Sequence, residues 1–348
     1  MPNEEEFIGN TPRGLDELSV WTSRHVEAAL EPELPIIDSH HHLYDDERGR
    51  YLAPEMLDEI SSGHNVVATV YLQHSASYRT EGPEALRPVG EVEFAAGVAR
   101  AAATQSVRLC AGIVGHADLA LGDQVLPVLE AQQEAGNGYL RGIRHGATWD
   151  AGRAGYGRTF ARRHLLLAPE FRAGYAHLSR MGLSFDAWIF HPQLPELIDL
   201  LQAFPETPVV LNHCGGILGI PPHTDHEQVF NVWSRHIRDL ARYPNLSVKL
   251  GGLGMLYGGH QFHHDIEPPS SETLAETWKP YVETCIEAFG PARAMFESNF
   301  PVDKQSCGYG ALWNAFKRLT RSYTDSERAC LFHDTAKKFY RLDLPPPA

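Results

Sequence analysis

The stretch IIDSHHHLYDD, residues 36–46, joins an apolar pair directly to three histidines, and it distinguishes two classes of α/β fold. A short apolar run that ends in polar residues is typical of a buried parallel strand. An open doubly wound sheet usually follows its first strand with a Gly-rich GxGxxG turn, which is missing here. A first strand that ends in imidazoles favours a closed barrel, in which chemistry gathers at the strand ends.

Seven further apolar runs follow the first one, which covers 35–40. They lie at 65–73, 107–115, 139–145, 183–191, 208–213, 246–251 and 294–300. Segments with helical periodicity lie between most of them, at 91–103, 124–135, 194–204, 231–243 and 277–289. Eight alternating units predict a (β/α)8 TIM barrel over residues 35–341, with an N-terminal extension at 1–34 and a proline-rich tail at 342–348. An open doubly wound sheet is the alternative.

The composition excludes several classes of function. A net charge of −14 without a Lys/Arg stripe argues against nucleic acid as a partner. No apolar run reaches the roughly 18 residues of a membrane span, and no signal peptide is recognisable, so we expect a cytoplasmic protein that acts on a small molecule. Five scattered cysteines without a CxxC pair argue against a disulfide framework or a thiolate zinc site. A homodimer is left open.

Polar residues follow most of the predicted strands, and a parallel barrel brings its carboxyl strand ends to one mouth. Alternation along a strand places His40 and His42 on the inner face and His41 on the outer face. A single strand-end histidine is more often structural, but several converging ones are hard to assign to packing. The residues concerned are Asp38 to His42, Gln73-His74, Arg144-His145, His191, Asn212-His213, Lys249 and Glu297 to Asn299. His40 and His42 would form half of a zinc site.

Seven motifs, in order, give the chain a recognisable likeness: DSHHHLYDD, GIVGHADL, RGIRHGATWD, FHPQLPEL, VVLNHCGG, VKLGGLGM and MFESNFPVDK. They resemble the amidohydrolase-related family of TIM-barrel hydrolases, in the branch with sugar-acid and muconolactone-type lactonases. The resemblance implies a hydrolase that opens a lactone or related cyclic ester. It matches His40 and His42 to the HxH pair of the first strand, His191 to the histidine of the fifth, and His213 to that of the sixth.

One position departs from the family pattern. The family usually ends its eighth strand with an aspartate that binds metal or acts as a base, and this chain has Asn299 there. An amide cannot take a proton from water near neutral pH. The base is then Asp303, Glu297 or His213. Alternative structural roles are an ion pair with Lys249 for Glu297 and a helix N-cap for Asp303.

The leading hypothesis is one divalent cation, zinc, held by His40, His42 and His191, which activates water for attack on the ester carbonyl. Arg144 and Lys249 would hold a substrate carboxylate, and Gln73, His145 and Trp149 would complete the pocket. For Arg144 the alternative is a salt bridge within the barrel wall. For the whole chain the alternatives are a metal-independent lactonase, a decarboxylase of the same superfamily, and a barrel that binds a ligand without catalysis.

Overall fold

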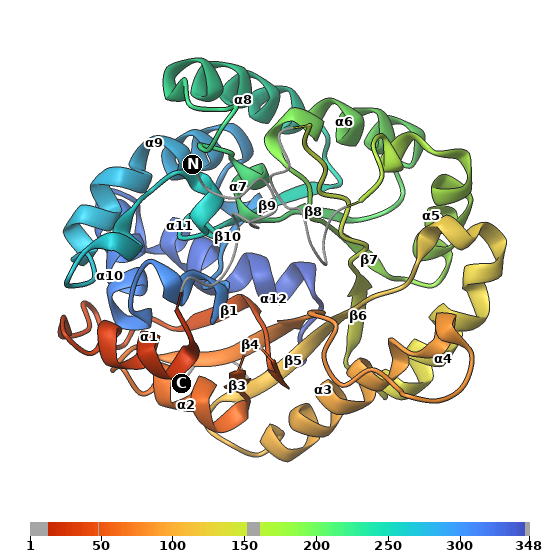
Figure 1. Cartoon of the computed structure of the whole chain (residues 1–348), viewed down its shortest axis with the longest axis horizontal. Coiled ribbons are helices and arrows are strands. Elements are labelled where there is room, and N and C mark those ends of the chain that lie inside the picture. Colours follow the sequence, from red (N-terminus) through yellow and green to blue (C-terminus); the bar gives the residue numbers. More distant parts are fainter. Residues whose placement is uncertain (1–12, 48, 152–160, 345–348) are drawn as a thin grey trace.

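Eight parallel strands form the centre of the computed structural model, which describes residues 13–47, 49–151 and 161–344. They pair in the order β1-β4-β5-β6-β7-β8-β9-β10, and helices surround them (Figure 1). Their bounds are β1 Ile36–His41, β4 Val66–Leu72, β5 Arg108–Gly115, β6 Leu140–Ile143, β7 Ser184–Ala187, β8 Val209–Leu211, β9 Leu246–Leu250 and β10 Ala294–Phe296. Each predicted run contains one of these strands or most of it, and the predicted (β/α)8 TIM barrel is confirmed.

The helices that follow the strands include all five predicted ones. Two begin earlier than the apolar pattern indicates, because a polar side chain caps the first turn: Asp225 accepts from the Gln228 N–H before α8, and Ser270 accepts from the Thr273 N–H before α9. The helices are α1 Leu15–Thr22, α2 Ala53–Ile60, α3 Val89–Ala102, α4 Leu126–Gly136, α5 Pro169–Arg180, α6 Leu194–Ala203, α7 His213–Gly216, α8 His226–Leu240, α9 Ser271–Phe289, α10 Tyr309–Leu319, α11 Asp325–Ala329 and α12 Thr335–Phe339.

The barrel closes between β10 and β1, where polar side chains supplement a short backbone ladder. The His42 N–H donates to the Phe300 carbonyl at 2.8 Å, and the Asn299 N–H donates to the His40 carbonyl at 2.8 Å. The Asp38 carboxylate accepts from both the N–H and the hydroxyl of Ser298, at 2.9 and 2.6 Å. Burial raises the pKa of Asp38 to about 6, against the lowering effect of these hydrogen bonds. Asp38 therefore closes the seam beneath the histidines.

A separate apolar cluster fills the inside of the barrel. It combines strand residues such as Ile37, Val70 and Met295 with Tyr340 and Leu342 from the C-terminal segment. The larger cluster lies between the strands and the helices. Leu342 was placed in the predicted tail, yet it is 5% exposed and packs under the barrel. The other end of that tail, at 345–348, lies outside the described residues.

The predicted N-terminal extension contributes α1 to the main core. Leu15, Leu18 and Trp21 are buried, and the Trp21 indole N–H donates to the Asp265 carbonyl at 3.0 Å. A two-stranded hairpin, β2 Tyr44–Asp46 and β3 Gly49–Tyr51, follows β1 and lies next to α1 and α2. The first twelve residues of the extension lie outside the described part of the chain. None of the described helices is long and apolar enough to cross a membrane.

Candidate active site

The end of β1 sends alternate histidines to opposite sides, as the strand period predicts. The Nε2 atoms of His40 and His42 lie 3.2 Å apart, whereas the His41 Nε2 contacts the Thr69 hydroxyl at 2.8 Å. The His42 Nδ1 donates to the Leu72 carbonyl at 2.9 Å, which fixes its tautomer and leaves Nε2 as an acceptor. The ring of His74 stacks on His42 with centroids 4.3 Å apart.

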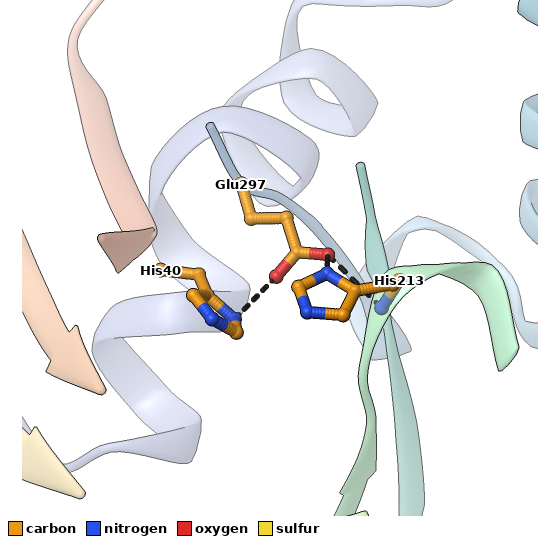
Figure 2. A group of neighbouring side chains, drawn as sticks. All are labelled: His40, His213 and Glu297. Carbon is orange, nitrogen blue, oxygen red and sulfur yellow. Dashed lines mark hydrogen bonds and ion pairs between the residues drawn. The ribbon is translucent and has the colours of Figure 1, made fainter. Parts of the chain in front are cut away.

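Glu297, just past β10, joins two of the site histidines (Figure 2). Its Oε1 accepts from the backbone N–H of His213 at 3.0 Å and from its Nδ1 at 2.7 Å. Its Oε2 lies 2.8 Å from the His40 Nδ1, a contact by distance that is not directed well enough to be a hydrogen bond. Two acceptor lone pairs would repel at this distance, so we assign a proton to each Nδ1. Both Nε2 atoms are then acceptors.

Three neutral imidazoles therefore have Nδ1 anchored and Nε2 available. Burial is the main cause that lowers the pKa of His40, His42 and His213, so all three are neutral near pH 7. Neutral imidazole is the form that binds metals, and ligating histidines usually donate their other N–H to a carboxylate or carbonyl. One possible ligand atom from each of His40, His213 and Glu297 lies within 4.8 Å of the others.

The separation of the two Nε2 atoms also suits a cation. Two nitrogens on one tetrahedral zinc, at about 2.0–2.1 Å each, lie about 3.3 Å apart. The observed 3.2 Å between His40 and His42 is close to this value. Without a proton or a cation between them, two facing lone pairs have no favourable interaction. The residues present therefore fit the divalent cation that the sequence predicts.

Arg144 follows β6 and brings a positive charge to the same histidines. Its Nη1 lies 3.3 Å from the His40 Nε2, and its Nη2 donates to the backbone carbonyl of Gln73. The residue is 5% exposed, and its Nε has no hydrogen-bond partner. Over the described ranges no carboxylate forms an ion pair with it. A buried guanidinium with no carboxylate in direct contact is costly, and an anionic ligand would relieve that cost.

Lys249, on β9, lies deeper than the sequence predicts for a residue that binds substrate. It is fully buried, and its ammonium donates to the Ser39 carbonyl at 2.8 Å and pairs with Asp186 at 3.0 Å. Its Nζ also lies 3.4 Å from the His40 Nδ1, which is a contact by distance because that nitrogen carries a proton. Lys249 is therefore held by Ser39 and Asp186, directly below His40. Its ion pair is with Asp186 rather than with Glu297.

Gln73 and His145 contact other parts of the barrel. For Gln73 the contact with Arg144 is made by the backbone carbonyl, and its side chain is half-buried. The Nδ1 of His145 accepts from the Leu119 N–H at 3.1 Å, and its ring packs against Phe171. Burial lowers the pKa of His145 to about 3. The roles of both residues in substrate binding stay predictions.

Trp149 and His191 lie on the loops after β6 and β7. The backbone N–H of Trp149 donates to Gln193, and the guanidinium of Arg163 lies over its indole ring. The Nδ1 of His191 accepts from the Leu218 N–H at 3.2 Å, and its ring meets the edge of His223. His191 is outside the group of His40, His213 and Glu297. Its role as a metal ligand stays a prediction.

Asn299 and Asp303 contact each other. The Asn299 Nδ2 donates to the Asp303 Oδ1 at 2.7 Å, and the Gly254 N–H donates to the Asp303 Oδ2 at 2.9 Å. Burial raises the pKa of Asp303 to about 8. Asp303 lies in the short turn Val302–Gln305 before α10, and the N-cap of α10 is Gly308. The alternative N-cap role of Asp303 is therefore not observed for α10.

Three residues of the site were not singled out from the sequence. Asp186 holds Lys249, Trp188 meets the edge of the His213 ring at 4.7 Å, and Glu91 accepts from the His74 N–H at 2.6 Å. The sequence does indicate Asp186, because it is an acid within the apolar run LSFDAWIFH. Glu91 lies on α3, in a segment with ordinary amphipathic periodicity, so no pattern distinguished it.

Comparison with known proteins identifies relatives over nearly the whole length. Residues 37–342 match the family described as amidohydrolase. The uncharacterized protein y4mH of Sinorhizobium fredii is 33% identical over 89% of this chain and 99% of its own length. An L-fucono-1,5-lactonase of Burkholderia multivorans is 26% identical over 90% of this chain and 98% of its own. The crystal structure of a Burkholderia multivorans amidohydrolase with bound zinc has a TM-score of 0.67 at 22% identity, covering 88% of this chain and 99% of that one.

Proposed function

Since this chain belongs to the amidohydrolase family, we propose that it is a hydrolase that opens a lactone, or a related cyclic ester, of a small carboxylate or sugar acid. The observation that carries the proposal is the convergence of three imidazoles, His40, His42 and His213, each with its Nδ1 anchored. Opening a cyclic ester needs a base for water and a positive group for the carbonyl oxygen. The likeness to L-fucono-1,5-lactonases supports this substrate class.

His213 is the group best suited to take a proton from water. Its Nδ1 donates to Glu297, so its Nε2 is the basic nitrogen, and the carboxylate would stabilise the imidazolium that forms. Asp303 is committed to Asn299 and Gly254, and Glu297 is committed to two histidines. Of the three candidate bases, His213 alone keeps an acceptor atom free of these contacts.

His40 and His42 would hold one divalent cation through their Nε2 atoms, with the predicted His191 as a further ligand. If His213 were the further ligand instead, its Nε2 would not be free to act as the base. Such an ion, when bound, polarises a carbonyl and lowers the pKa of water. Within this chain, Glu297 and the Leu72 carbonyl hold the two rings in the tautomers that binding needs. Arg144 is placed to pair with a carboxylate of the substrate.

A second form of the mechanism, without metal, has an observation in its favour. Arg144 and Lys249 both contact His40, at 3.3 and 3.4 Å, and these cations would oppose a metal ion at the same ring. In this form, Arg144 takes the part of the positive group that stabilises the developing oxyanion, while His213 remains the base.

The test uses protein purified without chelator or nickel resin. We expect turnover of at least one member of a panel of aldonolactones that includes L-fucono-1,5-lactone, followed by the release of acid, together with about one equivalent of transition metal by elemental analysis. His42→Ala should lose the metal and the activity. His41→Gln, a change on the outer side of the same strand, should keep both.

Full lactonase activity in metal-free protein would contradict the metal-dependent form and favour the second one. Metal loss in His213→Gln but not in His191→Gln would assign the further ligand to His213. Binding of lactones without any turnover, across the panel and with added zinc, would contradict the proposed function itself.

A further inference from the structure

The backbone of Asn299 is fixed beside the first strand. Its N–H donates to the His40 carbonyl at 2.8 Å, and the residue is 1% exposed. Its φ of 55° lies in the left-handed region, which asparagine tolerates better than most residues. The Asn299 carbonyl accepts from the Asp303 N–H at 3.2 Å. The only freedom left to Asn299 is therefore in its side chain, and chiefly in which way the amide is turned.

The Asp303 carboxylate decides that orientation. Burial raises the pKa of Asp303 to about 8, and above that pH the ionised carboxylate only accepts hydrogen bonds, so the atom of Asn299 that faces it at 2.7 Å must be Nδ2. The other carboxylate oxygen accepts from the Gly254 N–H at 2.9 Å, so the carboxylate cannot turn without losing a partner. The amide oxygen of Asn299 then lies on the side away from Asp303.

A purely structural account of Asp303 is insufficient. The Gly254 loop is already held through its carbonyl, which accepts from the Ser306 hydroxyl at 2.6 Å. Asp303 is fully buried, and burying an acid costs far more than burying the serine that could have capped the Gly254 N–H. What the carboxylate adds, beyond that cap, is its second oxygen on Asn299.

We propose that Asp303 is a positioning residue that acts through Asn299 and makes this strand end present a hydrogen-bond acceptor, the amide oxygen, to the water or hydroxyl groups in the mouth. The inference rests on the proposed function and adds a specific role to it. An acceptor beside His40 orients a donor without removing its proton. Asn299 would thus align the water or substrate while His213 takes the proton.

The decisive variant is Asp303→Asn, which keeps size and packing. The Gly254 N–H still needs an oxygen, so the new amide must direct its NH2 to position 299, and Asn299 must turn its own oxygen inward to accept it. The strand end then presents a donor in place of an acceptor. At pH 9, where Asp303 is ionised, we expect a melting temperature within a few degrees of wild type, and a kcat lower by about 10-fold or more on the aldonolactone that wild type turns over best.

The exchange variant Asn299→Asp/Asp303→Asn restores an acceptor at 299 and satisfies the Gly254 N–H. We expect it to recover most of the lost kcat, whereas Asn299→Asp alone, with two carboxylates in contact, should lose both stability and activity. Ser306→Ala is the matched control, because it loosens the same loop without touching Asn299, and its kcat should stay within about 3-fold of wild type.

Wild-type kcat in Asp303→Asn, or no recovery of kcat in the exchange variant, would overturn the inference. If wild type turns over no lactone, the proposed function has failed. In that case the melting temperatures of the variants test the contact between Asn299 and Asp303 independently of catalysis. The contact between Asn299 and Asp303 is supported if Asn299→Asp melts below wild type and the exchange variant melts near wild type. It is refuted if Asn299→Asp and the exchange variant melt at the same temperature.

Discussion

At the scale of single residues, the site depends on Glu297 more than on any one histidine. Its carboxylate contacts the Nδ1 atoms of both His40 and His213, and it also accepts from the backbone N–H of His213. One anion therefore sets two tautomers and offsets part of the positive charge of Arg144 and Lys249 nearby. Because Glu297 is fully buried, its effect is not weakened by solvent.

Glu297→Gln should abolish most activity while preserving the fold. The amide can keep one acceptor on His213, but its NH2 would then face the His40 Nδ1, so that ring must change its tautomer or lose its partner. We expect kcat to fall by about 100-fold or more, because the change disturbs both His213, the proposed base, and His40, which would hold the cation that polarises the carbonyl.

The matched control for this change is Glu196→Gln. Glu196 also contacts a histidine, the Nδ1 of His164 at 2.9 Å, but this pair lies at the surface. Its kcat should stay near wild type. A Glu297→Gln enzyme with kcat within a few-fold of wild type, measured on the same lactone, would show that the carboxylate is not needed for these tautomers.

The sequence predicted part of this site because strand ends carry positional information. His40, His42, His213, Glu297 and Arg144 were all expected at the mouth, and the structure brings them together. Depth along a strand was harder to predict: Lys249 lies below the mouth because Asp186 on the next-but-one strand draws its ammonium inward. Contacts between strands depend on register, which a single sequence does not specify.

At the scale of elements, the loops after β8 and β9 pack directly against His213. Gly252 has a φ of 63°, and a Cβ placed on it would lie 2.4 Å from the His213 Nδ1. His213 itself has a φ of 55°. The close approach of Gly252 leaves its imidazole no room to move away from Glu297. The glycine is thus needed both for its backbone conformation and for the space above it.

Gly252→Ala should therefore lower kcat by more than its effect on stability would predict. The new methyl group must displace the His213 ring, which breaks its alignment with Glu297, and we expect kcat to fall by about 10-fold or more. Gly182→Ala is the matched control: its φ is 68°, but nothing lies within 4 Å of the new Cβ. Both variants carry the backbone strain of about 1 kcal/mol. Equal kcat values for the two variants would contradict this account.

The elements themselves were largely predictable, and their exact ends were not. Apolar runs marked all eight strands because both faces of a parallel barrel strand are buried. Helix starts were misjudged where polar caps precede the apolar pattern, as at Asp225 and Ser270. Helix α5 escaped prediction because its sequence, PEFRAGYAHLSR, interrupts its apolar residues with charged ones and a glycine.

At the scale of the whole molecule, buried titratable groups of two kinds oppose each other. Burial raises the pKa of Asp38 to about 6, of Glu91 to about 7 and of Asp303 to about 8. Burial also lowers the pKa of five histidines to between about 3 and about 4, namely His41, His64, His145, His191 and His260. The folded barrel thus keeps both kinds of group neutral at pH values where the unfolded chain would charge them.

These shifts predict that stability falls as the pH falls below about 7. In that range unfolding lets the buried histidines take up protons, and with His40, His42 and His213 they outnumber the three acids that release them. Above it, Asp303 still releases a proton on unfolding, but Lys317, whose pKa burial lowers to about 8, takes one up, so stability levels off toward pH 8. Denaturant titrations from pH 4.5 to 8.5, in the presence of a chelator, measure the acid slope and the plateau. Asp303→Asn removes the proton that Asp303 releases on unfolding, which is worth up to about 1.4 kcal/mol per pH unit, so the stability of this variant should keep rising between pH 7 and 8 where wild type levels off. A stability that rises steadily to pH 8 in wild type would show that these acids are ionised in the folded protein.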